Sequence, residues 1–249
     1  EALTIARAAG ASDGDLALIV ADRDTPNADE TIGLVKQSRG LGEAMHVDVA
    51  DAGSTDKLFD EIAAKYGRLD ILVNNAGIGM TRPIEGVTEQ DWDDCLDINL
   101  KAAFFGCKFA IPHLRAAGGG SIINTASNAG ILPRAHDPVY SISKLALVGL
   151  TKSLALCHSV DRIRINAVCP GPVGDTGMMN ADLARATDVA ATRQQFIDAS
   201  PLARAHRRMI TPEEVAEAIL YLASDAAAMV TGTCIAIDGG KSLGVPPKA

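Results

Sequence analysis

Short apolar segments alternate with amphipathic helical segments along this chain, and no other feature restricts its fold as strongly. The expected strands span residues 16–21, 44–49, 69–74, 121–125, 162–169 and 233–237. The expected helices span residues 2–9, 29–38, 55–66, 89–97, 101–116, 141–158 and 212–223. Such alternation predicts a parallel, doubly wound α/β sheet covered by helices on both faces. We expect a single domain over residues 1–249, with the polar stretch 171–208 as a substrate lid.

Composition narrows the possible partners. The formal charge is −8 at pH 7, which argues against nucleic acid or an anionic membrane. No apolar run approaches the roughly 20 residues that span a membrane, and the start EALTIARAAG lacks the features of a signal peptide. The five cysteines are scattered without a C-x-x-C motif, and the five histidines are dispersed. We therefore expect a cytoplasmic protein without a disulfide framework or metal site.

Three residues around the expected helix 141–158 suggest acid–base chemistry. Tyr140 precedes Lys144 by four positions, so the two side chains share a helix face. An adjacent ammonium favours the phenolate and lowers the pKa of the phenol from its usual value of about 10. Ser127 follows the strand 121–125 and could hydrogen-bond the same substrate oxygen. The spacing predicts proton transfer to or from an alcohol, although a lone Y-x-x-x-K motif also occurs without catalysis.

Two strand ends carry residues suited to a dinucleotide. Asp22 ends the expected strand 16–21, where a carboxylate accepts hydrogen bonds from the ribose 2′-OH and repels a 2′-phosphate. This favours NAD over NADP, although the neighbouring Arg23 could accommodate a 2′-phosphate and Asp22 could be an ordinary loop residue. The segment 74–77, NNAG, follows the most apolar strand and permits close approach of a nucleotide, or is a simple turn. Asp48 and Val49 could line an adenine pocket in the same layer.

Taken together, these motifs resemble the short-chain dehydrogenase/reductase family. The shared motifs are NNAG at 74–77, Asn99 in DINL, Ser127, Tyr140-x-x-x-Lys144, CPG at 169–171 and the TG…DGG ending, in the family's order and spacing. The resemblance covers essentially the whole chain and implies a Rossmann-like fold, an NAD(P) cofactor and hydride transfer.

The resemblance also implies a role for each matching residue. Tyr140 would be the general acid/base, and Lys144 would lower its pKa and hold the nicotinamide ribose. Ser127 would orient the substrate oxygen, and Asn99 would support a water that links Lys144 to solvent. The residues matching the family's cofactor contacts are Asp22, Asp48, Val49, Asn75, Ala76 and Gly77 for adenosine, Tyr140 and Lys144 for the ribose, and Pro170, Gly171, Val173 and Thr176 for the nicotinamide.

Two departures from the family pattern affect the cofactor. The glycine-rich turn TG-x-x-x-G-x-G and its strand are absent, and Glu1 aligns just after the last glycine. We expect a gap of about ten ångströms, two strand spacings, beside the strands that end in Asp22 and Asn74. A chain with that gap should fold poorly and bind NAD weakly, so we hypothesise about 15–25 further N-terminal residues, the length of a strand and its turn. The segment PVGDTGMM carries one extra residue before Thr176.

The combined interpretation is an NAD-dependent dehydrogenase that acts on a small-molecule secondary alcohol or ketone, a sugar, polyol or similar hydroxy compound. The alternatives are an NADPH-dependent 3-oxoacyl thioester reductase and a catalytically idle nucleotide-binding sensor or scaffold. Arg134 and His136 could bind a carboxylate or polyol, or be ordinary loop residues. Met178 and Met179 could be lid or core residues. The resemblance and the broad apolar surface of helix 141–158 predict a homotetramer.

Overall fold

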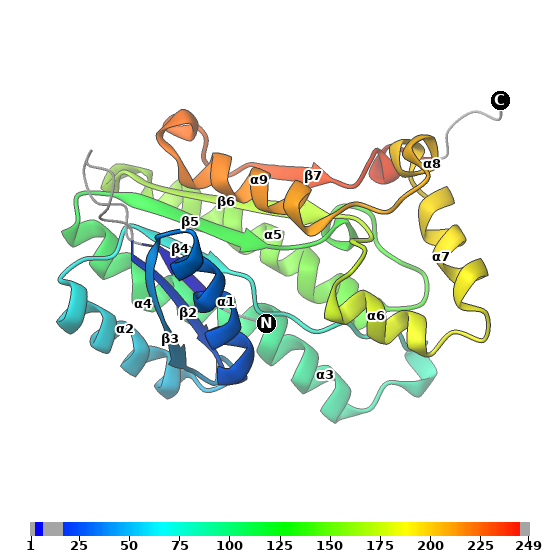
Figure 1. The fold of residues 1–249 in the computed structure, drawn as a ribbon, viewed down its shortest axis with the longest axis horizontal. Coiled ribbons are helices and arrows are strands. Elements are labelled where there is room, and N and C mark those ends of the chain that lie inside the picture. Colours follow the sequence, from blue (N-terminus) through cyan, green and yellow to red (C-terminus); the bar gives the residue numbers. More distant parts are fainter. Residues whose placement is uncertain (1–2, 7–16, 245–249) are drawn as a thin grey trace.

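The computed structural model describes residues 3–6 and 17–244, which build one sheet with helices on both faces (Figure 1). The strand order is β3-β2-β1-β4-β5-β6-β7, and every pair is parallel except those that involve β1. The strands are β1 (Leu3–Ala6), β2 (Ala17–Asp22), β3 (Leu41–His46), β4 (Ile71–Asn74), β5 (Gly120–Thr125), β6 (Ile163–Pro170) and β7 (Cys234–Ile237). This is the predicted doubly wound α/β class.

Apolar layers fill both sides of the sheet. On one face α2 (Ala52–Tyr66), α4 (Ala102–Ala116) and α5 (Pro138–His158) cover the strands, with Phe59 and Ile122 among the fully buried side chains. On the other face lie α1 (Thr25–Gln37) and α9 (Pro212–Ala223). A strand buried on both faces reads as a continuous apolar run, which is why β4 was visible in the sequence.

The N-terminal prediction was wrong. Residues 2–9 were expected to form a helix, whereas Leu3–Ala6 form a strand that pairs antiparallel with both β2 and β4. The expected gap in the sheet is therefore occupied. Two open strand edges offer unpaired N–H and C=O groups on each side, and pairing with both outweighs the weak local helix preference. Residues 7–16, which connect β1 to β2, lie outside the described residues.

The carboxyl ends of the parallel strands meet at one edge of the sheet, where open α/β sheets bind ligands. Helix α3 (Glu89–Leu96) and a π-helical turn (Asp97–Lys101) follow β4. The predicted lid segment forms three helices, α6 (Gly177–Ala184), α7 (Val189–Asp198) and α8 (Pro201–His206), at one end of the molecule (Figure 1). They carry a small core of their own that includes Met179, Leu183, Ile197 and Met209.

Among the described helices, α5 with its following turn is long and apolar enough to cross a membrane by length and composition alone. Half of the apolar window lies buried inside the protein. A core helix of a globular domain passes the same test, and α5 packs against β6 and α3.

Candidate functional site

Ser127, Tyr140 and Lys144 come together at the carboxyl edge of the sheet. Tyr140 and Lys144 lie one turn apart on α5, and the Lys144 Nζ atom is 5.8 Å from the centroid of the Tyr140 ring. All three residues are buried, with exposed fractions of 3% for Ser127, 6% for Tyr140 and 3% for Lys144. Lys144 donates from Nζ to the backbone oxygen of Thr125 at 2.9 Å, which ties the helix to the end of β5.

The pKa of Tyr140 differs from the sequence expectation. Burial raises it above the usual value of 10.0, while a side-chain hydrogen bond with Ser127 and the positive charge of Arg134 lower it in part. The net shift is upward, opposite to the lowering expected from the neighbouring Lys144 ammonium. Desolvation of a phenolate in this position outweighs the favourable charges.

Asn99 holds the loop that follows β4. Its Oδ1 accepts from the Ile78 backbone N–H at 2.7 Å, and its Nδ2 donates to the Ile78 oxygen at 3.0 Å and to Ser143 Oγ at 3.2 Å. Asn99 sits in the π-helical turn, a feature that often marks functional sites. A methyl group placed on Gly77 would lie 3.2 Å from Asn99 Oδ1 and 3.3 Å from Lys144 Nζ. The predicted Asn99, Gly77 and Lys144 therefore form one close-packed group.

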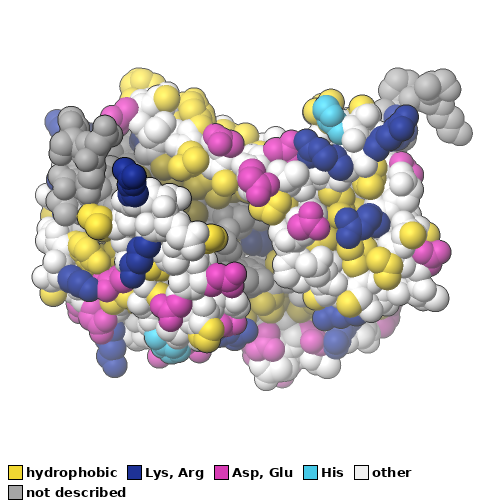
Figure 2. Space-filling model, in the orientation of Figure 1, with side chains coloured by type: hydrophobic (Ala, Val, Ile, Leu, Met, Phe, Trp, Pro, Cys, Tyr) yellow, Lys and Arg dark blue, Asp and Glu magenta, His cyan; other side chains and the backbone are white. Residues whose placement is uncertain are grey.

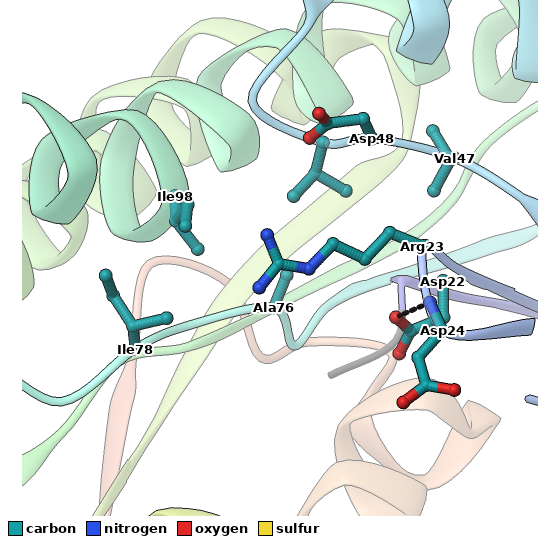
Figure 3. A pocket seen from close by; sticks show the side chains of 9 residues that line it. Asp22, Arg23, Asp24, Val47, Asp48, Ala76, Ile78 and Ile98 are labelled. Atoms are coloured by element: carbon teal, nitrogen blue, oxygen red, sulfur yellow. Dashed lines mark hydrogen bonds between the residues drawn. The ribbon is translucent and has the colours of Figure 1, made fainter. Parts of the chain in front are cut away.

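A cavity of about 150 Å³ lies beside β2 and β4, on a face that is visibly hollowed (Figure 2). The buried Asp22 stands at its edge and accepts from the Asp24 N–H at 2.9 Å (Figure 3). Burial raises the pKa of Asp22, whereas hydrogen bonds from the backbone N–H groups of Asp24 and Arg23 lower it. The lining residues are Asp22, Arg23, Asp24, Val47, Asp48, Val49, Ala76, Ile78 and Ile98.

Four predicted adenosine residues, Asp22, Asp48, Val49 and Ala76, thus line one cavity. Asn75 and Gly77 are the chain neighbours of Ala76, but they do not line the cavity. Sequence reasoning did not find Ile98, which lies beside Asn99 in DINL, or the path of Arg23. The Arg23 side chain extends across the cavity toward Ala76 (Figure 3).

The CPG turn leads from β6 toward the lid segment. Gly171 donates to the Ile237 oxygen at 2.9 Å, and a methyl group on it would lie 3.0 Å from the Asp238 Cα atom, so this turn packs directly on the DGG turn. Thr176 caps α6: its Oγ1 accepts from the Met179 N–H at 3.2 Å. Pro170 ends β6, and Val173 bridges to Ile210. Asp175, directly before Thr176, adopts a left-handed φ of 55°.

Of the four candidate substrate contacts, some lie near the site and others do not. Arg134 lies against the Tyr140 ring, with its Cζ atom 5.2 Å from the ring centroid, whereas His136 is exposed. Met178 packs over Gly79, since a methyl on that glycine would lie 3.2 Å from Met178 Cγ. Met179 belongs to the core of the lid segment.

These residues fit a nicotinamide dinucleotide at the adenosine and ribose ends. The cavity beside Asp22 suits an adenosine, and the bare backbone of Gly77 beside Lys144 leaves room that a side chain would fill. The end of β1 nearest this edge is Leu3, because β1 is antiparallel and Leu3 pairs with Ala21 and Asn74. Within the described ranges, no group of three or more His, Cys, Asp or Glu residues could hold a metal ion.

Comparison with known proteins gives a consistent result. A family model described as enoyl-(acyl carrier protein) reductase matches residues 2–242. A 4-formylbenzenesulfonate dehydrogenase of Comamonas testosteroni is 36% identical over 93% of this chain and 90% of its own length. A D-threitol dehydrogenase of Mycolicibacterium smegmatis is 35% identical over 89% of this chain and 82% of its own length.

Solved structures agree with the sequence relatives. The crystal structure of a protein from Burkholderia xenovorans, described as a short-chain dehydrogenase/reductase, superposes with a TM-score of 0.86 at 33% identity. The match covers 92% of this chain and 86% of that one. Members of the short-chain dehydrogenase/reductase family are oxidoreductases that act on CH–OH donors with NAD(P) cofactors. The fold, the clustering of the motif residues and these matches show that the chain belongs to this family.

Proposed function

We propose that this protein is an NAD-dependent dehydrogenase that transfers hydride between the nicotinamide and a secondary alcohol or ketone. The observation that carries the proposal is the meeting of Ser127, Tyr140 and Lys144 beside the Asp22 cavity at one edge of the sheet. When bound, the cofactor supplies the hydride acceptor or donor at nicotinamide C4.

The chain's own residues move the proton. In reduction the Tyr140 hydroxyl donates its proton to the carbonyl oxygen and becomes a phenolate. In oxidation Tyr140 first loses its proton to solvent, and the resulting phenolate accepts the alcohol proton. Ser127 hydrogen-bonds the same oxygen and orients it. Lys144 would hold the ribose hydroxyls of the cofactor, and its positive charge would favour the phenolate. Asn99 fixes the loop at Ile78, beside Gly77. The other residues that we propose to contact the cofactor are Asp22, Asp48, Val49, Asn75, Ala76, Gly77, Pro170, Gly171, Val173 and Thr176. Thr176 also caps α6.

The preference for NAD follows from Asp22. Its buried carboxylate lines the adenosine cavity, and the backbone N–H groups of Asp24 and Arg23 favour its charged form. It would accept hydrogen bonds from the 2′-OH and repel a 2′-phosphate. We expect kcat/KM to be at least about tenfold higher with NAD than with NADP, an effect of about 1.4 kcal/mol.

The substrate we propose is a sugar, polyol or similar hydroxy compound, with α6–α8 as its lid. Support comes from the D-threitol relative and from Met178, which reaches over Gly79 after β4. A panel of sugars, polyols and hydroxy acids, followed by NADH absorbance with both cofactors, tests the proposal. Failure of every alcohol and ketone with either cofactor would contradict it.

An NADPH-dependent 3-oxoacyl thioester reductase is the second candidate. It is favoured by Arg23, whose side chain crosses the adenosine cavity and could pair with a 2′-phosphate, and by the acyl carrier protein in the family description. A tenfold preference for NADPH with an acyl thioester would support it. The idle sensor or scaffold is disfavoured, because such a protein has no need for the buried Ser127, Tyr140 and Lys144 arrangement.

We also propose a homotetramer in a reducing compartment such as the cytoplasm. Helix α5 leaves Ile142 44% and Leu145 53% exposed, and Phe104 on α4 is 46% exposed. Apolar residues beyond one core face favour a second packed surface. All five cysteines are free thiols. A monomer in light scattering would contradict the assembly.

A further inference from the structure

The lid segment is closed at its base. Val173 and Ile210 form an isolated parallel bridge, and the Gly174 N–H donates to the Ile210 oxygen at 2.8 Å. A methyl group on Gly174 would lie 3.3 Å from Met209 Cε, so the two ends of the segment are in contact. Residues 174–209 therefore leave the body of the domain and return to it at one point, shortly after the CPG turn.

A second attachment lies inside the segment, between α7 and α8. Ser200 is 1% exposed, and its Oγ donates to the Asp238 backbone oxygen at 2.6 Å. The Leu202 N–H donates to the Gly239 oxygen at 3.0 Å. Figure 1 shows α8 at the end of β7, the strand that leads into this DGG turn. Two hydrogen bonds thus join the lid segment to the turn at residues 238–240.

Ser200 precedes the first residue of α8, but its hydroxyl does not cap that helix. A serine in this position usually accepts a hydrogen bond from an N–H group in the first turn of its own helix. Within the described residues the Ser200 side chain makes no such bond to α8 and donates to the DGG turn instead. A methyl group on Gly239, whose φ is 60°, would lie 2.3 Å from Ser200 Oγ, so the contact requires glycine.

The DGG turn also supports the CPG turn that is proposed to hold the nicotinamide. The Gly171 N–H donates to the Ile237 oxygen at 2.9 Å, and a methyl group on Gly171 would lie 3.0 Å from Asp238 Cα. Asp238 is 3% exposed, and its carboxylate oxygens accept from the N–H groups of Gly240 and Ser242, each at 2.8 Å. The DGG turn is therefore held from within, and it contacts both the CPG turn and the lid segment.

Helices α6 and α7 are held less firmly. Among the described residues, their hydrogen bonds and ion pairs stay within the lid segment, as between Arg185 and Asp182. Their contact with the loop after β4 is apolar, since a methyl group on Gly79 would lie 3.2 Å from Met178 Cγ. A flexible apolar side chain can leave such a contact without exposing an unpaired polar group. The segment therefore combines a fixed point at Ser200 with a releasable contact at Met178.

We infer that Ser200 is a positioning residue, whose bond to the DGG turn is the pivot on which α6 and α7 close over the substrate. Hinges commonly lie at the ends of elements, and only Ala199 and Ser200 separate α7 from α8. In this arrangement α8 stays with the body of the domain, and closure is linked to the CPG turn through the shared DGG turn. The inference rests on the proposed dehydrogenase function for the identity of the cofactor and the substrate.

Hydrogen exchange without ligand tests the pivot alone. Because the Leu202 amide is bonded to the DGG turn, the amides of α8 should exchange at least about tenfold more slowly than those of α6 and α7, although α8 is the shortest of the three helices. Ser200→Ala should abolish this difference, and Ser200→Thr, which keeps the hydroxyl, should restore part of it. Exchange of α8 as fast as that of α6 and α7 in the unaltered protein would overturn the inference.

Ser121 provides the matched control. It is also 1% exposed, and its Oγ donates to a backbone oxygen, that of Leu222, at 3.0 Å. Ser121→Ala and Ser200→Ala make the same chemical change at equal burial, so each should lower the melting temperature by about 2–6 °C. Only Ser200→Ala should alter exchange in the lid segment.

Cofactor binding and kinetics connect the pivot with the proposed reaction. Because the CPG turn and the lid segment share the DGG turn, NADH should slow exchange in α6 and α7 of the unaltered protein and of Ser121→Ala, but not of Ser200→Ala. Ser200→Ala should bind NADH within about twofold of the unaltered protein and raise the KM of the alcohol about tenfold, with kcat changed by less than about threefold.

Two outcomes separate the pivot from the dehydrogenase. If Ser200→Ala matched Ser121→Ala in lid exchange and in KM, the role of Ser200 would be confined to stability, and the inference would fail while the dehydrogenase stood. Slow exchange of α8 that is lost in Ser200→Ala, in a protein that neither binds NADH nor oxidises any alcohol, would support the pivot and contradict the dehydrogenase.

Discussion

At the scale of single residues, the chemistry depends on a tyrosine that is 6% exposed. Replacing Tyr140 with Phe removes one oxygen and keeps the ring that packs with Cys95, Ala129 and Val139. We expect turnover to fall by roughly 10²–10⁴-fold, the usual contribution of a positioned acid or base. NADH binding, measured by fluorescence, should change little, because the cavity beside Asp22 is untouched.

A second tyrosine provides the matched control. Tyr66 is the last residue of α2 and lies far from the site. Its hydroxyl donates to Glu43 Oε1 at 2.7 Å. Tyr66→Phe makes the same chemical change and should retain full turnover. If Tyr140→Phe remained as active as Tyr66→Phe, the assignment of Tyr140 as the acid/base would be wrong.

The position of a residue could be predicted from the sequence where short-range geometry alone determines it. The i, i+4 spacing places Tyr140 and Lys144 on one helix face wherever that helix lies, so their proximity was predictable. The contact of Arg134 with Tyr140 depends on the path of the loop 131–137, which no short-range pattern specifies. The raised pKa of Tyr140 depends on burial by the assembled fold, and the sequence argument considered only the neighbouring charge.

At the scale of elements, α4 packs tightly enough on β4 to exclude a methyl group. A methyl on Gly106 would lie 2.5 Å from Asn74 Oδ1. Asn74 cannot retreat freely, because its Nδ2 donates to Asn124 Oδ1 at 2.8 Å. We expect Gly106→Ala to lower the free energy of unfolding by about 1–3 kcal/mol, measured by urea titration.

In α1, Gly33 has no atom within 4 Å of such a methyl, so Gly33→Ala should be stabilising by about 0.5–1 kcal/mol.

The start of α9 gives a pH-dependent prediction. Glu214 accepts from the Thr211 N–H at 2.8 Å and from Arg208 Nη2 at 2.7 Å. The Arg208 hydrogen bond, followed by that of Thr211, lowers the pKa of Glu214 from 4.5 to about 2. A lowered pKa stabilises the fold above pH 4.5, and that contribution is lost as pH falls toward 2.

Glu214→Gln should therefore destabilise the protein at pH 7 by about 0.5–1 kcal/mol, since solvent screens the exposed ion pair and the cap contributes most. The difference from the unaltered protein should shrink in thermal melts between pH 5 and pH 3. Glu213→Gln makes the same charge change in the same helical turn, where the Glu213 side chain makes no hydrogen bond in the described structure. An equal loss in both variants would contradict the capping role.

Elements with strong local signals were predicted well. Helix α9 has its predicted bounds, because Thr211, Pro212 and Glu214 define its first turn. Strand β3 was expected at 44–49 and lies at Leu41–His46, because its parallel register with β2 pairs Leu41 with Ala17. Val47 and Asp48 then leave the sheet and line the cavity. Register between strands is a tertiary property that apolar runs alone do not specify.

At the scale of the whole molecule, the sheet is continuous only through β1. This strand joins β2 and β3 on one side to β4–β7 on the other, and it pairs with both neighbours over Leu3–Ala6. A four-residue apolar segment has no local signal that distinguishes a central strand from a helical turn. Its conformation is decided by the two strand edges that it satisfies, which explains why the helix prediction failed there.

Hydrogen exchange tests this architecture directly. If β1 is a central strand, the amides of Leu3–Ala6 are hydrogen-bonded to β2 or β4 and should exchange as slowly as those of β4. The edge strand β3 pairs only with β2, so part of its amides should exchange faster and serve as the internal control. Ile5→Pro removes an N–H within β1 and should destabilise the protein by about 3 kcal/mol. Rapid exchange at Leu3–Ala6 together with a neutral Ile5→Pro would show that the two halves of the sheet are held together by something other than β1.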